Sequence, residues 1–218
     1  MYRTVIFDLD GTLLDTIGDL AAAANAVCRE NGWPEYTVQA VEGMVGHGIP
    51  NLVSRFSPAE AQEPQTLERT LAQFNRVYGA HNMELTAPYA GMPEAVERLR
   101  AAGVRTAVLS NKAHALAGPV VEDYYPGQFP WVQGALPGLP TKPDPTLLHR
   151  LMEQMGASPE DTLFVGDSDV DIRTARNGGL TSCGVLWGFR GRAELETEGA
   201  DCLARTPEEL VKAVLGDG

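Results

Sequence analysis

The stretch Thr4-Val5-Ile6-Phe7-Asp8-Leu9-Asp10-Gly11-Thr12 near the start of the chain decides the fold. Its first part, Thr4–Phe7, is a short run of β-branched and aromatic residues, which is typical of a buried strand. Polar turn residues follow at once, so Asp8 and Asp10 come at the carboxyl end of that strand. Because ligands of parallel α/β sheets bind beyond the carboxyl ends of the strands, chemistry is expected at these aspartates.

The segment that follows, over residues 15–82, has the sequence pattern of helices. A helix is expected from Asp15, which can cap it, and Asn31-Gly32 supplies its stop. Amphipathic stretches continue over residues 33–82 with breaks at Gly46-His47-Gly48 and Ser57-Pro58 and almost no strand-like run. The pattern predicts a helical insertion after the first strand.

Beyond Pro88 helices and strands alternate. Strands are expected over residues 104–109, 162–165 and 184–187, with helices starting at Pro93, near Asp144 and near Asp169. Such a series implies right-handed crossovers and a parallel sheet covered by helices on both faces. We therefore expect an α/β core domain made of residues 1–14 and 86–218, and an all-helical cap domain over residues 15–85.

Composition limits the possible functions. The 218 residues include 17 Lys and Arg against 29 Asp and Glu, a net charge of −12, whereas nucleic-acid binding needs a basic patch. We expect no nucleic-acid partner. The N-terminus lacks the apolar core of a signal peptide, no apolar run reaches the length of a membrane span, and the three cysteines form no CxxC pair. A cytoplasmic protein without a membrane partner is expected.

Polar residues follow several of the expected strands: Asp8 and Asp10, then Ser110-Asn111, then Gly166-Asp167-Ser168-Asp169 with Asp171. The topology brings them to one edge of the sheet. Two unit charges 4 Å apart repel by about 4 kcal/mol at an effective dielectric of 20, so gathered carboxylates call for a hard cation. Mg²⁺ prefers oxygen ligands and is commonly held by carboxylates and substrate phosphate. Lys142 supplies a second possible positive charge.

Each signal has a plainer interpretation when it stands alone. Asp-Gly is a frequent turn dipeptide, Ser110-Asn111 is compatible with a helix cap, and Lys142 with a solvated loop. Asp169 is interpreted as a capping or surface carboxylate and is left out of the metal site. For His47, a bend in a loop and a contact to substrate both remain open.

Taken in order and spacing, Asp8-x-Asp10-Gly11-Thr12, Ser110-Asn111, Lys142-Pro143 and Gly166-Asp167-x-x-x-Asp171 resemble the four motifs of haloacid dehalogenase superfamily phosphohydrolases. The similarity to the phosphoglycolate phosphatase branch covers almost the whole chain and includes the loop Val45-Gly46-His47-Gly48. The resemblance implies a Rossmann-like core, a helical cap of the C1 type and Mg²⁺ as the usual cofactor.

The resemblance also implies roles for matching positions. Asp8 is the expected nucleophile and Asp10 the expected acid and base, and Lys142 completes the catalytic set. The expected metal ligands are Asp8, Asp10 through its backbone carbonyl, Asp167 and Asp171; for Asp171 a direct contact, a contact through water and an anchoring role for Lys142 stay open. The expected substrate contacts are Thr12, Ser110, Asn111, His47 and Gly48.

The function expected from this resemblance is Mg²⁺-dependent hydrolysis of a small phosphorylated metabolite through an aspartyl-phosphate, with 2-phosphoglycolate as first choice. Asp10 favours phosphate esters over dehalogenation, because a departing halide needs no proton. The alternatives are a pyrophosphatase, a sugar-phosphate phosphatase or a phosphoglucomutase of the same superfamily, and, in another class, a non-catalytic phospho-aspartate switch. The chain is expected to be a monomer or a homodimer.

Overall fold

A computed structural model describes residues 1–216 of the chain. The strands are β1 (Thr4–Phe7), β2 (Leu14–Asp15), β3 (Ala87–Pro88), β4 (Arg105–Ala113), β5 (Trp131–Ala135), β6 (Thr162–Gly166), β7 (Thr181–Val185) and β8 (Cys202–Ala204). The α-helices are α1 (Ile17–Asn31), α2 (Val38–Glu42), α3 (Ile49–Phe56), α4 (Pro64–His81), α5 (Met92–Ala101), α6 (His114–Tyr124), α7 (Thr146–Met155), α8 (Asp169–Gly178), α9 (Arg192–Thr197) and α10 (Pro207–Leu215). Two short 3-10 helices span Ala59–Ala61 and Pro159–Asp161.

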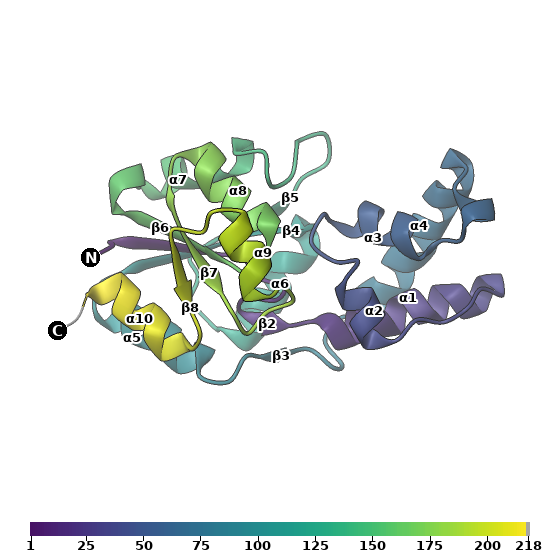
Figure 1. The fold of residues 1–218 in the computed structure, drawn as a ribbon, viewed down its shortest axis with the longest axis horizontal. Coiled ribbons are helices and arrows are strands. Elements are labelled where there is room, and N and C mark those ends of the chain that lie inside the picture. The colour runs from purple at the N-terminus through teal and green to yellow at the C-terminus, as the bar shows by residue number, and fades with distance from the viewer. Residues whose placement is uncertain (217–218) are drawn as a thin grey trace. The chain divides into compact units, whose positions relative to one another are not determined.

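The main sheet has six strands in the order β5-β4-β1-β6-β7-β8, and every pair is parallel (Figure 1). Strand β1 is central: β4 and β5 follow on one side, and β6, β7 and β8 follow on the other. The strand order therefore reverses at β1, and this reversal point is where α/β sheets bind ligands. The core is the Rossmann-like α/β fold that the resemblance implies.

Helices cover both faces of this sheet (Figure 1). Successive side chains of a strand point to opposite faces. Val5 and Phe7 of β1 belong to a core cluster with residues of α5, α6 and α10, whereas Ile6 belongs to a second cluster with residues of α7 and α8. Because β1 is fully buried on both faces, Val5, Ile6 and Phe7 form a continuous apolar run rather than alternating with polar residues.

The chain forms two compact units, Met1–Leu14 with Pro88–Gly218 and Asp15–Ala87. The Asp15–Ala87 unit contains α1 to α4, as the sequence predicts, with a core that includes the stacked rings of Phe74 and Tyr78. Its loop breaks lie where they are expected, between α2 and α3 and after α3. The assignment of the two units as core and cap domains with limits at 14/15 and 85/86 stays a prediction.

A buried carboxylate ties the two ends of the helical unit together. Asp19, in the first turn of α1, is 2% exposed. Its Oδ1 accepts a hydrogen bond from the Leu85 backbone N–H at 2.9 Å. Its Oδ2 accepts from the Thr86 backbone N–H at 2.9 Å and from the Thr86 hydroxyl at 2.6 Å. The start of the insertion is thus held to the chain that leaves it.

We expect Asp19→Ala to lower the free energy of unfolding by about 3 kcal/mol, because several buried donors would lose a charged acceptor. Thermal and urea unfolding followed by circular dichroism measures this loss. Asp161→Ala, which removes a half-exposed carboxylate 3.7 Å from Arg3, is the matched control with a change near zero. Equal losses in the two variants would show that the Asp19 bonds contribute nothing.

The structure corrects several of the expected limits of strands and helices. Strand β4 was expected to stop at residue 109 but continues to Ala113, and β7 spans Thr181–Val185 rather than 184–187. Strands β5 and β8 were not predicted, because one contains a glycine and the other is only three residues long. Asp15 is not the N-cap of α1; that position is Thr16, while Asp15 accepts a bond from the Ile17 backbone N–H at 3.3 Å.

Candidate active site

The structure gathers the expected carboxylates at the point where the strand order reverses. Asp8 directly follows β1, and Asp167 directly follows β6 next to it. Asp171 lies in the first turn of α8. Each of these three offers a carboxylate oxygen, and the three oxygens lie within 4.8 Å of one another. All three side chains are buried, which places a concentrated negative charge away from bulk water.

Lys142 bridges two of these carboxylates. Its Nζ lies 2.7 Å from Asp8 Oδ1 and 2.6 Å from Asp171 Oδ1, and its side chain is only 4% exposed. The ammonium also lies 5.7 Å from the centre of the Phe164 ring. The predicted catalytic lysine and the predicted nucleophile are therefore direct ion-pair partners.

The electrostatics of this cluster leave excess negative charge. Burial, followed by repulsion from Asp171, raises the pKa of Asp8 to about 7, although Lys142 opposes the rise. Burial and the same neighbour raise the pKa of Asp167 well above its usual range. Burial alone would lower the pKa of Lys142, but its ion pairs with Asp171 and Asp8 outweigh that and raise it. One ammonium thus does not neutralise three carboxylates.

Asp171 is fully engaged on both oxygens. Its Oδ2 accepts from the Ser168 backbone N–H at 3.1 Å and from the Ser168 hydroxyl at 2.6 Å. The first of these bonds belongs to a capping box at the start of α8, in which the Ser168 side chain accepts from the Asp171 backbone N–H in return. Its Oδ1 accepts from Lys142. Of the roles left open for Asp171 by the sequence, the contacts favour that of an anchor for Lys142.

Asn111 holds the loop that carries Lys142. Its Nδ2 donates to the Lys142 backbone carbonyl at 3.1 Å, and its Oδ1 accepts from the Lys142 backbone N–H at 2.9 Å. A side-chain amide that pairs with both groups of one residue fixes the position of that backbone. Asn111 was expected to contact substrate, and this positioning role was not predicted.

Asp167 is held by the loop after β7. Its Oδ2 accepts from the Phe189 backbone N–H at 2.7 Å, and its Oδ1 accepts from the Thr12 hydroxyl at 3.3 Å. A Cβ added at Gly188 would lie 2.3 Å from the Gly11 carbonyl oxygen and 2.3 Å from the Asp167 Cβ. Only a glycine allows the backbone to approach this closely.

We expect Gly188→Ala to displace Asp167 and to lower both stability, by about 1–3 kcal/mol, and turnover. The matched control is Gly191→Ala, three residues later, where an added Cβ meets nothing within 4 Å. Unfolding curves and phosphate release on both variants check the prediction. If the two variants behaved alike, the close approach at Gly188 would be irrelevant to the site.

Asp10 is paired with Lys112, for which no role in the site was predicted. Its Oδ1 accepts from the Lys112 Nζ at 2.8 Å, and the Lys112 side chain is 3% exposed while that of Asp10 is 16% exposed. Lys112 stands beside the Ser110-Asn111 motif but has no spacing signal of its own. Its burial depends on the local path of β4, which the sequence pattern does not reveal.

Of the remaining predicted site residues, Ser110 and Thr12 are buried, whereas His47 and Gly48 belong to the helical unit. Ser110 is buried, and its hydroxyl accepts from the Lys112 backbone N–H at 3.1 Å. Thr12 is fully buried, with its hydroxyl on Asp167. His47 and Gly48 lie in the Asp15–Ala87 unit, in a bend and at the N-cap of α3. The substrate contacts expected of these residues stay predictions.

Charged residues left out of the site have other partners. Asp169 lies 3.3 Å from Arg173, and Arg173 also pairs with Glu198 at 2.5 Å. Arg190 lies 3.2 Å from Glu194.

Within residues 1–216, no helix is both long enough and apolar enough to cross a bilayer.

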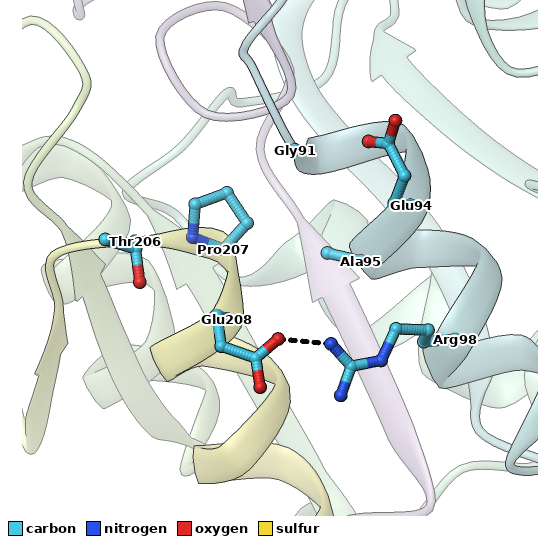
Figure 2. A pocket seen from close by; sticks show the side chains of 7 residues that line it. All are labelled: Gly91, Glu94, Ala95, Arg98, Thr206, Pro207 and Glu208. Carbon is cyan, nitrogen blue, oxygen red and sulfur yellow. Dashed lines mark hydrogen bonds and ion pairs between the residues drawn. The ribbon is translucent and has the colours of Figure 1, made fainter.

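A surface cavity of about 310 Å³ lies elsewhere in the unit formed by Met1–Leu14 and Pro88–Gly218, between α5 and α10 (Figure 2). Its lining includes Gly91, Glu94 and Pro207, and an ion pair between Arg98 and Glu208 crosses it. None of the predicted site residues lines this cavity. It is therefore separate from the carboxylate cluster.

The residues of the cluster suit a divalent metal ion. The donor atoms are carboxylate oxygens, which hard cations such as Mg²⁺ prefer. A divalent cation would also offset the charge that Lys142 leaves uncompensated, and it would oppose the burial and the carboxylate repulsion that raise the pKa values of Asp8 and Asp167. Charge and donor type therefore both fit a metal at Asp8 and Asp167, next to Asp171.

Comparison with known proteins agrees with this picture. The profile of the family described as "Haloacid dehalogenase-like hydrolase" matches residues 5–185. The phosphoglycolate phosphatase of Pseudomonas putida is 35% identical over 202 residues, which cover 90% of this chain and 74% of the relative. The phosphoglycolate phosphatase of Aquifex aeolicus is 30% identical and is covered over 95% of its length, with 96% of this chain. A crystal structure from Lactobacillus delbrueckii subsp. bulgaricus superposes with a TM-score of 0.94 at 31% identity, over 99% of each chain.

Fold and site thus define an α/β enzyme with a buried carboxylate centre at the reversal point of its sheet. The chain belongs to the haloacid dehalogenase-like hydrolase family, and within that family it is a phosphatase.

Proposed function

We propose that the protein hydrolyses a small phosphate monoester, 2-phosphoglycolate, through a phosphorylated Asp8, with Mg²⁺ as cofactor. The observation that carries this proposal is the buried cluster in which Lys142 lies 2.7 Å from Asp8, with Asp167 and Asp171 alongside. A carboxylate that acts as a nucleophile needs a nearby cation to offset the phosphate charge, and this arrangement supplies one.

In the first half of the reaction, an Asp8 oxygen attacks phosphorus and the bond from phosphorus to the leaving oxygen breaks. Asp10, two residues further on, donates a proton to that oxygen, so the leaving group departs as an alcohol. The products of this step are the alcohol and an aspartyl-phosphate on Asp8. Splitting one difficult displacement into two easier ones is the general advantage of covalent catalysis.

In the second half, water attacks the same phosphorus and Asp10 accepts the proton of that water. The bond from phosphorus to Asp8 breaks, inorganic phosphate leaves, and the Asp8 carboxylate is regenerated. Asp10 has 16% of its side chain exposed, which gives it more access to substrate and water than the more buried Asp8 and Asp171 have.

The metal would be held by Asp8, by Asp167 and by the Asp10 backbone carbonyl, with Asp171 behind them. When bound, it supplies positive charge to the phosphoryl oxygens. Lys142 supplies a second cation at the nucleophile, and Ser110 is proposed to donate its hydroxyl proton to a phosphoryl oxygen. Thr12 and Asn111 act mainly on Asp167 and on the Lys142 loop, consistent with their observed hydrogen bonds.

The choice of 2-phosphoglycolate rests on the relatives. The Pseudomonas putida and Aquifex aeolicus proteins carry the name phosphoglycolate phosphatase, and each match spans nine-tenths or more of this chain. The family profile, which matches residues 5–185, spans both the strands that position the carboxylates and the helical insertion.

Phosphate release from a substrate panel tests the proposal. The panel contains 2-phosphoglycolate, pyrophosphate, hexose phosphates and an aryl phosphate, each measured with Mg²⁺ and with EDTA. We expect the enzyme to prefer 2-phosphoglycolate. We also expect EDTA to abolish turnover and added Mg²⁺ to restore it. Metal-dependent turnover of another member alone would keep the phosphatase chemistry and refute the substrate. Full turnover in EDTA would refute the metal requirement.

A further inference from the structure

Lys112 is a second buried cation next to the site, distinct from the lysine that pairs with the nucleophile. Lys142 has two carboxylate partners, Asp8 and Asp171. The Nζ of Lys112 instead lies 2.8 Å from Asp10 Oδ1, and its side chain is 3% exposed. The two lysines therefore serve different carboxylates, and the charge of Lys112 is not needed to hold Asp8.

A bulge at the end of β4 explains why this lysine is buried. Leu109 pairs with Gln133 and Ala113 pairs with Ala135, so three residues of β4 lie opposite the single residue Gly134 of β5. Bulges of this kind redirect side chains next to active sites. A Cβ at Gly134 would lie 2.6 Å from the Lys112 carbonyl oxygen, so the bulged backbone requires a glycine opposite it. The fold thus builds a specific position for Lys112.

The location of Asp10 determines what Lys112 can reach. If Asp10 protonates the ester oxygen of the substrate, as the proposed function requires, the first carbon of the leaving group lies next to Asp10. An ammonium 2.8 Å from an Asp10 oxygen is then close to any group attached to that carbon. In 2-phosphoglycolate that group is a carboxylate.

On this basis, and resting on the proposed function, we propose that Lys112 is a specificity-determining residue that binds an anionic group on the carbon next to the ester oxygen. In the structure Asp10 accepts from Lys112, and in the complex the substrate carboxylate shares this ammonium with Asp10. A local cation is also needed because the chain carries a net charge of −12, which repels an anionic substrate at long range.

The test compares two substrates on one enzyme preparation. 2-Phosphoglycolate has the carboxylate, and 2-hydroxyethyl phosphate has the same ester linkage with a neutral hydroxymethyl group in its place. For Lys112→Gln we expect kcat/KM for 2-phosphoglycolate to fall by about 30-fold or more relative to that for 2-hydroxyethyl phosphate. The loss should lie largely in KM, and Lys112→Arg should restore part of the preference. Lys212→Gln, which removes an exposed charge in α10, should leave the ratio unchanged.

The ratio of the two substrates does not depend on how much of a variant is folded, so a destabilised Lys112→Gln still gives an answer. An equal loss for both substrates would overturn the proposal and leave Lys112 as a residue that only positions Asp10. An unchanged ratio with no loss would overturn it as well. Failure of the wild-type enzyme to hydrolyse either ester would instead refute the proposed function, so the two failures are distinguishable.

Discussion

Asp8→Asn should abolish turnover of every phosphate ester, with a loss of about 10⁶-fold, the size found when a covalent nucleophile is removed. The amide cannot form the bond to phosphorus that the proposed mechanism requires. The fold should survive, because Asn has nearly the same shape and because burial already raises the pKa of Asp8 to about 7. Phosphate release measures the loss, and thermal unfolding checks the fold.

The control for this variant is Asp169→Asn, which makes the same change at the start of α8 in a carboxylate that pairs with Arg173 outside the cluster. Its turnover should stay close to that of the wild type. Measurable turnover by a folded Asp8→Asn protein, beyond any deamidation back to aspartate, would rule out Asp8 as the nucleophile.

Asp10→Asn should give a loss that depends on the leaving group. For 2-phosphoglycolate, whose alkoxide needs a proton to depart, we expect kcat/KM to fall by about 10² to 10⁴-fold. For an aryl phosphate the phenolate leaves without help, so kcat/KM should fall far less. The second half of the reaction also needs Asp10, so the variant should release the phenol in a rapid burst followed by slow turnover.

Stopped-flow absorbance with an aryl phosphate resolves this burst, whose amplitude should match the amount of enzyme. The conservative variant Asp10→Glu serves as a comparison, because it keeps the carboxyl group and moves it. Equal losses for alkyl and aryl esters, without a burst, would contradict the acid and base role of Asp10.

The core of the candidate site was accessible from the sequence for a physical reason. Parallel strands end at one edge of the sheet, so the residues after β1 and β6 lie at the same edge, and they are neighbours there because β1 pairs with β6. Asp8 and Asp167 accordingly lie together in the structure, with Lys142 and Asp171 next to them. The order of the motifs along the chain was enough to indicate this.

Other parts of the site depend on tertiary contacts that no local pattern reveals. Lys112 is buried because β4 bulges against β5, and that register follows from how two strands pair rather than from either strand alone. Phe189 contributes only its backbone N–H to Asp167, and such a contact leaves no trace in residue type. Gly188 looks like an ordinary loop glycine until the approach of Gly11 is known.

The fold likewise has parts that the local sequence pattern predicts and parts that depend on tertiary contacts. The apolar run of β1 was predicted from its composition, because a strand buried on both faces has a continuous hydrophobic pattern. Strand β8 is only three residues long and owes its place to pairing with β7. Asp19 gave no signal of burial, since its partners Leu85 and Thr86 lie more than sixty residues further along the chain.

The central claim, hydrolysis through a phosphorylated Asp8, is tested most directly by the stereochemical course at phosphorus. A thiophosphate ester made chiral with ¹⁸O is hydrolysed in water enriched in ¹⁷O, and the configuration of the released thiophosphate is determined. Two successive in-line displacements, first by Asp8 and then by water, predict net retention of configuration. Inversion would mean that water attacks the substrate directly, and it would contradict the aspartyl-phosphate.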